Sequence, residues 1–103
     1  MKLILIATAF LALSSCATSL TQESMKIVQT NQPSDVKGCK TLGEVKGHSS
    51  YGGLMMQEAG KNYAKNEAVN NASAMGATHI LWTLAEGGFF GGNATGVAYN
   101  CKK

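Results

Sequence analysis

Three cysteines carry the clearest chemistry in this 103-residue sequence. Cys16 follows Leu13-Ser14-Ser15, and these small residues close an apolar run, 3–13, that begins after a lysine. A positive start, a short apolar run and small residues before the cleavage point are the parts of a secretory signal peptide, and the cysteine makes the last part a lipobox. We therefore predict that residues 1–15 are removed and that Cys16, the new N-terminus, carries lipid on its sulfur and on its amine.

The anchor has two other interpretations. An uncut membrane helix is disfavoured, because the apolar run is about 11 residues long and a span needs roughly 20. An ordinary cleaved secretory signal stays open. With two or three acyl chains the attachment would be stable. Ala17, rather than aspartate, follows the cysteine, which in a Gram-negative host favours the outer membrane. We expect a protein lipid-anchored to the outer membrane and facing the periplasm.

Cys39 and Cys101 are the remaining cysteines. An even pair in an oxidising compartment predicts a disulfide. The alternatives are two unpaired thiols or a metal site, and the latter lacks any structural zinc spacing. We therefore predict one disulfide, and neither a metal ion nor a cofactor.

Acid–base or nucleophilic catalysis finds little support in the sequence. Glu44 is expected on a strand, while Glu58 and Glu67 are nine residues apart on one helix, so no close carboxylate pair is implied. His48 adjoins Ser49 and Ser50, but neighbouring residues of a loop rarely present their side chains together, and no Gly-x-Ser-x-Gly elbow is present. We expect no catalytic residues and no enzymatic activity.

A glycine-rich run, residues 86–93, holds two adjacent phenylalanines, Phe89 and Phe90. The run lacks the Lys-Ser/Thr of a phosphate-binding loop. Two adjacent rings cannot both point to one face of a sheet, and large exposed apolar groups tend to mark contact sites. We predict that Phe89 and Phe90 bind a partner. The alternative is a loop that folds back and buries both rings.

The charge of the chain argues against nucleic acid. Residues 16–103 contain eight lysines, six carboxylates and no arginine, a net side-chain charge of +2. A nucleic-acid footprint would be a clustered basic stripe. We divide the chain into a signal peptide (1–15), a lipidated N-terminus and tether (16–24), and a single domain (25–103).

The pattern of the domain predicts strand, helix, strand, strand. A first short strand is expected near 25–28, followed by a strand at 40–46 with a bulge at Gly43 and a loop at 47–53. A helix is expected within 54–75; it ends at Gly76 and could begin only near Gly60. Strands at 78–84 and 95–101 follow, and the simplest interpretation of residues 86–93 between them is a long glycine-rich hairpin. On the first of these last two strands, Ile80, Trp82 and Leu84 should share one face.

The two cysteines test the topology. If the last strand lies between the strand after Cys39 and the strand from Thr78, antiparallel to both, Cys39 and Cys101 meet at one edge of the sheet. Their Cα atoms can then come within the roughly 4.4–6.8 Å that a disulfide requires. The predicted fold class is therefore α+β: a small, mostly antiparallel sheet of three or four strands with one helix packed on one face and a single disulfide.

Three segments support a resemblance to a known family. They are Gly-Cys-Lys-Thr-Leu-Gly-Glu-Val-Lys-Gly at 38–47, Met-Gly-Ala-Thr-His-Ile at 75–80 and Gly-Val-Ala-Tyr-Asn-Cys at 96–101. With these, the chain resembles small proteobacterial lipoproteins of domain-of-unknown-function family 4156, from about Met25 onward. More distantly, it is similar to the outer-membrane sensor lipoproteins of the Rcs envelope-stress phosphorelay. That resemblance implies signalling through protein contacts without catalysis, although the sensor domain has two disulfides and this chain has cysteines for one.

Two functions follow as expectations. The first is an outer-membrane lipoprotein that contacts an unknown envelope protein, with envelope integrity or stress sensing as its most concrete form. The second is a periplasmic module that binds a small ligand or the cell wall through the glycine-rich loop and Tyr51 or Trp82.

Overall fold

The computed structural model describes residues 19–53 and 55–102, so Cys16 and the predicted signal peptide lie outside the described residues. In chain order, the elements are η2 (Ser24–Lys26), β1 (Val28–Thr30), η3 (Pro33–Val36), β2 (Lys40–Ser49), α2 (Gln57–Ala74), β3 (His79–Gly88) and β4 (Gly91–Asn100).

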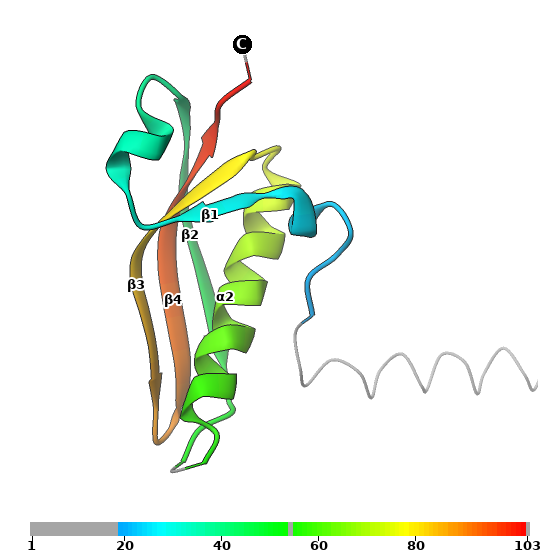
Figure 1. Cartoon of the computed structure of the whole chain (residues 1–103). Coiled ribbons are helices and arrows are strands. Elements are labelled where there is room, and N and C mark those ends of the chain that lie inside the picture. Colours follow the sequence, from blue (N-terminus) through cyan, green and yellow to red (C-terminus); the bar gives the residue numbers. More distant parts are fainter. Residues whose placement is uncertain (1–18, 54, 103) are drawn as a thin grey trace, which may run out of the picture.

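The strands form one sheet with the order β1-β3-β4-β2. Strand β4 lies between β3 and β2 and is antiparallel to both, whereas β1 pairs with β3 in parallel. Helix α2 covers one face of this sheet, and the short η3 turn lies on its other side (Figure 1). The predicted α+β fold class, with one helix on a mostly antiparallel sheet, is confirmed.

Cys39 and Cys101 form the predicted disulfide, with their Cα atoms 4.5 Å apart. Cys39 directly precedes β2, and Cys101 directly follows β4. Because these neighbouring strands are antiparallel, the start of one and the end of the other share an edge. The bridge closes a loop with a sequence separation of 62 residues, so it joins the two ends of most of the domain.

Helix α2 packs through a stripe of very small residues. Gly60, Ala64, Ala68 and Ala72 are all buried, and their spacing of four places them on one face. The helix begins at Gln57, within three residues of the expected start near Gly60. Gly60 lies in its first turn, where an added Cβ would meet the Tyr51 carbonyl at 2.0 Å. The helix ends before Gly76, whose φ of +81° suits the left-handed position after a last turn.

The sheet is longer than the sequence predicts. Strand β2 continues to Ser49, beyond the predicted end at 46, and its expected bulge falls between Thr41 and Gly43. Strands β3 and β4 extend through most of 86–93, the predicted loop, and leave only Phe89 and Phe90 as the turn. The expected glycine-rich hairpin is therefore present, but most of its glycines belong to the strands.

A second bulge, on β3 between Trp82 and Leu84, changes which side chains share a face. An extra residue in one strand reverses the alternation beyond it. Ile80 and Trp82 are buried as predicted, whereas Leu84, expected on the same face, is 45% exposed.

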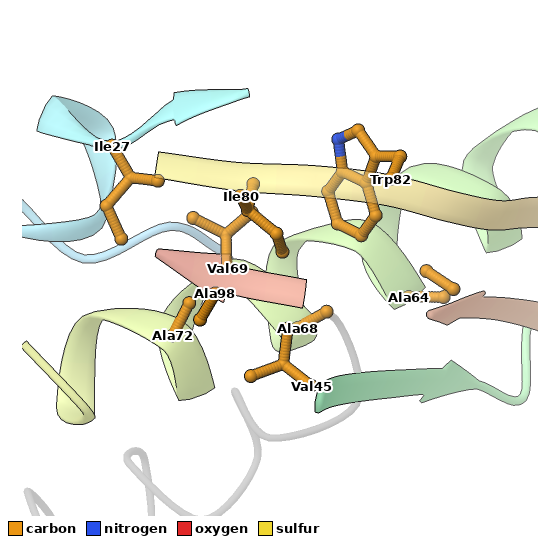
Figure 2. Close-up of a cluster of buried hydrophobic side chains, with 10 residues drawn as sticks. Ile27, Val45, Ala64, Ala68, Val69, Ala72, Ile80, Trp82 and Ala98 are labelled. Carbon is orange, nitrogen blue, oxygen red and sulfur yellow. The ribbon is translucent and has the colours of Figure 1, made fainter. Parts of the chain in front are cut away.

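The core lies between α2 and the sheet (Figure 2). Ile80 and Val69 are its largest fully buried apolar side chains. Trp82 closes one end: its indole N–H donates to Gln29 Oε1 at 3.3 Å, and Lys65 Nζ lies 5.1 Å from its ring centroid. This contact with α2 gives the tryptophan a structural role in the core.

The segment 19–24, which we expected to belong to a tether, packs on the domain. The Thr21 N–H donates to Asn70 Oδ1 at 3.1 Å, and Asn70 Nδ2 donates to the Ser19 carbonyl at 2.9 Å. Ser24 is fully buried, and Leu20 packs against the core. Residues 19–24 therefore pack against α2 and the core.

Candidate functional site: the tip of the β3–β4 hairpin

Phe89 and Phe90 form the turn of the β3–β4 hairpin at one end of the molecule (Figure 1). Their side chains are solvent-accessible, with 63% of Phe89 and 92% of Phe90 exposed. The two rings contact each other edge to face, with centroids 5.5 Å apart. The folded-back alternative, in which both rings are buried, is therefore wrong.

The loop before α2 braces this turn through backbone contacts. The Gly53 N–H donates to the Gly88 carbonyl at 3.3 Å. A Cβ added at Gly52 would meet the Phe89 carbonyl at 2.5 Å, and one added at Gly87 would meet the Gln57 carbonyl at 1.9 Å. The glycines thus let three segments approach closely, so the two rings stand on a supported turn.

The same loop adds two methionines to this end of the molecule. Met55 is 93% exposed and Met56 is 39% exposed. Met56 is the residue before the first turn of α2, and Met55 precedes it. Met55, Met56, Phe89 and Phe90 are called the tip residues below. Both methionines were expected inside the helix; their position shortly after Gly52-Gly53 was the available signal for a loop.

A polar row crosses the open face of the sheet beside the tip residues. His48 Nδ1 lies 3.1 Å from Asn93 Oδ1, and Asn93 is in register with Glu86 on β3. These three side chains line a cavity of about 390 Å³ together with Phe89 and Phe90. Apolar rings beside a carboxylate, an amide and an imidazole could hold a small polar ligand.

The other candidate residues are not brought together as a catalytic set. Glu44 pairs with Lys46 at 3.4 Å, and Glu58 pairs with Lys61 at 2.8 Å. His48 bonds to Asn93, while the Ser49 hydroxyl accepts from the Tyr51 N–H at 3.2 Å. Within residues 19–53 and 55–102, no three His, Cys, Asp or Glu side chains form a group that could hold a metal ion.

The aromatic residues named for ligand binding have structural contacts instead. Trp82 is 8% exposed. Tyr51 packs on Tyr63, with ring centroids 5.0 Å apart. A ligand at this end of the molecule would therefore meet the phenylalanines and the polar row. No helix in the described part of the chain is long and apolar enough to cross a membrane.

Comparisons of the chain with protein-family models, with curated proteins and with solved structures gave no match. The resemblance seen in the sequence therefore stays a prediction.

Proposed function

We propose that this chain is a lipid-anchored protein of the outer membrane that acts by contacting another envelope protein through its tip residues. The observation that carries the proposal is the exposure of two adjacent phenylalanines on a supported turn. Aromatic side chains are enriched among the residues that dominate binding energy, because they bury a large area with few rotatable bonds. The resemblance to envelope sensor lipoproteins agrees with this role and makes envelope integrity or stress sensing its most concrete form.

The supported turn also lowers the entropic cost of binding. A turn already held by the Gly53–Gly88 hydrogen bond and by close backbone contacts loses little freedom when a partner covers it. Burying a phenylalanine side chain contributes about 1.5–3 kcal/mol. The two rings together therefore account for about 3 kcal/mol or more, which is roughly a hundredfold in affinity.

Removing the rings tests the proposal. The tagged protein, expressed at native level, is cross-linked in cells and purified, and bound proteins are compared between wild type and Phe89→Ser/Phe90→Ser. The matched control is Met25→Ser/Val28→Ser, which also removes two exposed apolar side chains, here 67% and 48% exposed, from another part of the surface. A partner that is lost only from the phenylalanine variant supports the proposal. Equal recovery from all three proteins contradicts it.

A second function, binding of a small ligand or of cell-wall material, is favoured by the cavity beside the tip. Sugar rings stack on aromatic faces while their hydroxyls bond to carboxylates and amides, and both kinds of group line the cavity. Calorimetric titration with wall fragments tests it directly. Heat of binding that disappears in Glu86→Gln/Asn93→Ala would favour this function, and the absence of heat with the wild type would remove it.

A further inference from the structure

Among residues 19–53 and 55–102, the outer edge of β2 is the longest strand edge without a neighbouring strand. Strand β2 lies at one end of the order β1-β3-β4-β2 and runs for ten residues, whereas β1 at the other end has three. A strand edge carries a row of backbone donors and acceptors that can pair with another strand. A second strand could pair only with those β2 residues whose backbone N–H and C=O groups point away from β4.

Three hydrogen bonds identify the outward residues. The Lys46 carbonyl accepts from Asn71 Nδ2 of α2 at 3.0 Å. On the neighbouring strand, the carbonyls of Tyr99 and Thr95 accept bonds from Thr78 and Thr83 and so point away from β2. Thr95 is the register partner of Lys46, so Lys46 turns its backbone groups to the outer edge. Because direction alternates along a strand, Glu44 and His48 do the same.

The charges along this edge select one self-pairing. Glu44 and Lys46 are adjacent outward residues, and their side chains are 59% and 72% exposed. In an antiparallel pair of β2 strands centred on Val45, each Glu44 faces the Lys46 of the other copy. Centring the pair on Glu44 or on Lys46 instead places like charges opposite each other, which is destabilising.

We propose that two copies of this chain pair through their β2 edges, antiparallel and centred on Val45, to form one continuous sheet. The two Glu44–Lys46 pairs each exchange both backbone hydrogen bonds, as directly opposed residues of an antiparallel ladder do. The bulge between Thr41 and Gly43 limits the ladder at each end. The bond from Asn71 to the Lys46 carbonyl occupies the edge of the single chain and is shared or replaced in the dimer.

The side of the domain on which the N-terminal segment lies agrees with this dimer. This step rests on the proposed function, because it assumes the lipid anchor at Cys16. Antiparallel edge pairing is related by a two-fold axis perpendicular to the sheet, so both α2 helices lie on the same face. The N-terminal segment leaves the domain on that helix side, held by Asn70 (Figure 1). Ser19 is three residues from Cys16, a reach of about 10 Å. Both lipid groups can therefore enter one membrane, where confinement raises the effective concentration of a small interface.

Photo-cross-linking tests the proposal in the full lipidated protein. A photoreactive residue replaces His48, which in this register lies opposite Leu42 of the second copy, and two differently tagged copies are co-expressed at native level. We expect an adduct that contains both tags, with the link mapped to 40–43. Lys46→Glu should lower its yield about tenfold, because two attractive pairs become repulsive. The reversed variant, Glu44→Lys/Lys46→Glu, should restore it.

Lys40→Glu is the control, because residue 40 lies beyond the bulge that limits the ladder, and its adduct should equal that of wild type. Absence of the two-tag adduct in wild type overturns the dimer. The dimer is also overturned if the reversed variant, still folded as judged by its Cys39–Cys101 bridge, does not restore the yield of the adduct. Loss of a partner protein from the phenylalanine variant with no two-tag adduct at 48 would retain the proposed function and reject the dimer. A two-tag adduct at 48, together with equal recovery of every partner protein from the phenylalanine variant, would retain the dimer and reject the proposed function.

Discussion

Gly47→Ala is expected to destabilise the domain strongly, although replacing a glycine by alanine inside a strand is usually stabilising. Glycine inside a strand ordinarily costs about 0.5–1 kcal/mol relative to alanine. Here, however, a Cβ at position 47 would lie 1.8 Å from the Ala64 carbonyl oxygen and 2.8 Å from the Ala68 nitrogen. Both atoms belong to the backbone of α2, so no side-chain rotation relieves the overlap.

The size of the effect follows from the distance that α2 must retreat. A gap of 0.5–1 Å between packed surfaces already removes about a quarter to a half of their dispersion attraction. To relieve the 1.8 Å approach, α2 must move away from β2 by more than that gap. Overpacking costs about 1–3 kcal/mol in typical cores, and we place this case at about 3 kcal/mol. For a domain of this size that corresponds to a fall in Tm of roughly 12–24 °C.

The assay is chemical and thermal unfolding followed by the fluorescence of Trp82, the single tryptophan of the chain. Gly88→Ala is the matched control. Its Cβ would meet only the Gly91 carbonyl, at 3.4 Å, so its stability should change by less than about 1 kcal/mol. An unfolding free energy for Gly47→Ala equal to or above that of wild type would refute the close helix–sheet approach on which this reasoning depends.

Three further predictions concern the bridge, the N-terminal segment and the tip. Cys39→Ala/Cys101→Ala should lower the unfolding free energy by about 4 kcal/mol, from the loop entropy of a 62-residue separation, and an unchanged denaturation midpoint would contradict this. Asn70→Ala removes the two hydrogen bonds between Asn70 and segment 19–24, so the Thr21 amide hydrogen should exchange faster with solvent. An unchanged exchange rate would show that other contacts protect this amide. Phe90→Ser should leave the unfolding free energy within about 0.5 kcal/mol of wild type, because the ring is 92% exposed, and a large loss would show that the ring supports the fold.

The sequence predicts that β4 lies between β2 and β3, and it predicts the disulfide, because both depend on local signals that agree with each other. The bulge at Gly43 and the end of α2 before Gly76 follow from glycine chemistry at single positions. With β4 between β2 and β3, the cysteines at 39 and 101 then had to meet at one edge.

The length of the hairpin could not be predicted in the same way. Glycine is depleted in strands, so residues 86–93 indicate a loop when only local propensity is considered. The structure needs glycine there because Gly87 and Gly92 contact the backbone of α2 at Gln57 and Gly60. Those contacts join segments about 30 residues apart in the sequence, and no short pattern encodes them.

The exposed site was predictable in part. The pair Phe89-Phe90 was identifiable, because two adjacent large rings beside glycines cannot both be buried on one face. The contribution of Met55 and Met56 depends on where the loop before α2 lies relative to the hairpin turn. Likewise, the row of His48, Asn93 and Glu86 depends on the register of three strands, all of which extend beyond their predicted bounds at these residues.

Photo-cross-linking from position 90, in cells that make the lipidated protein at native level, tests the central claim most directly. A photoreactive residue at Ser34, exposed on η3 away from the hairpin tip, is the matched control. Contact of a partner with the tip residues predicts a discrete adduct with one envelope protein from position 90 and none from position 34. Adducts from position 90 only to lipid or wall material, or the same protein adduct from both positions, would contradict it.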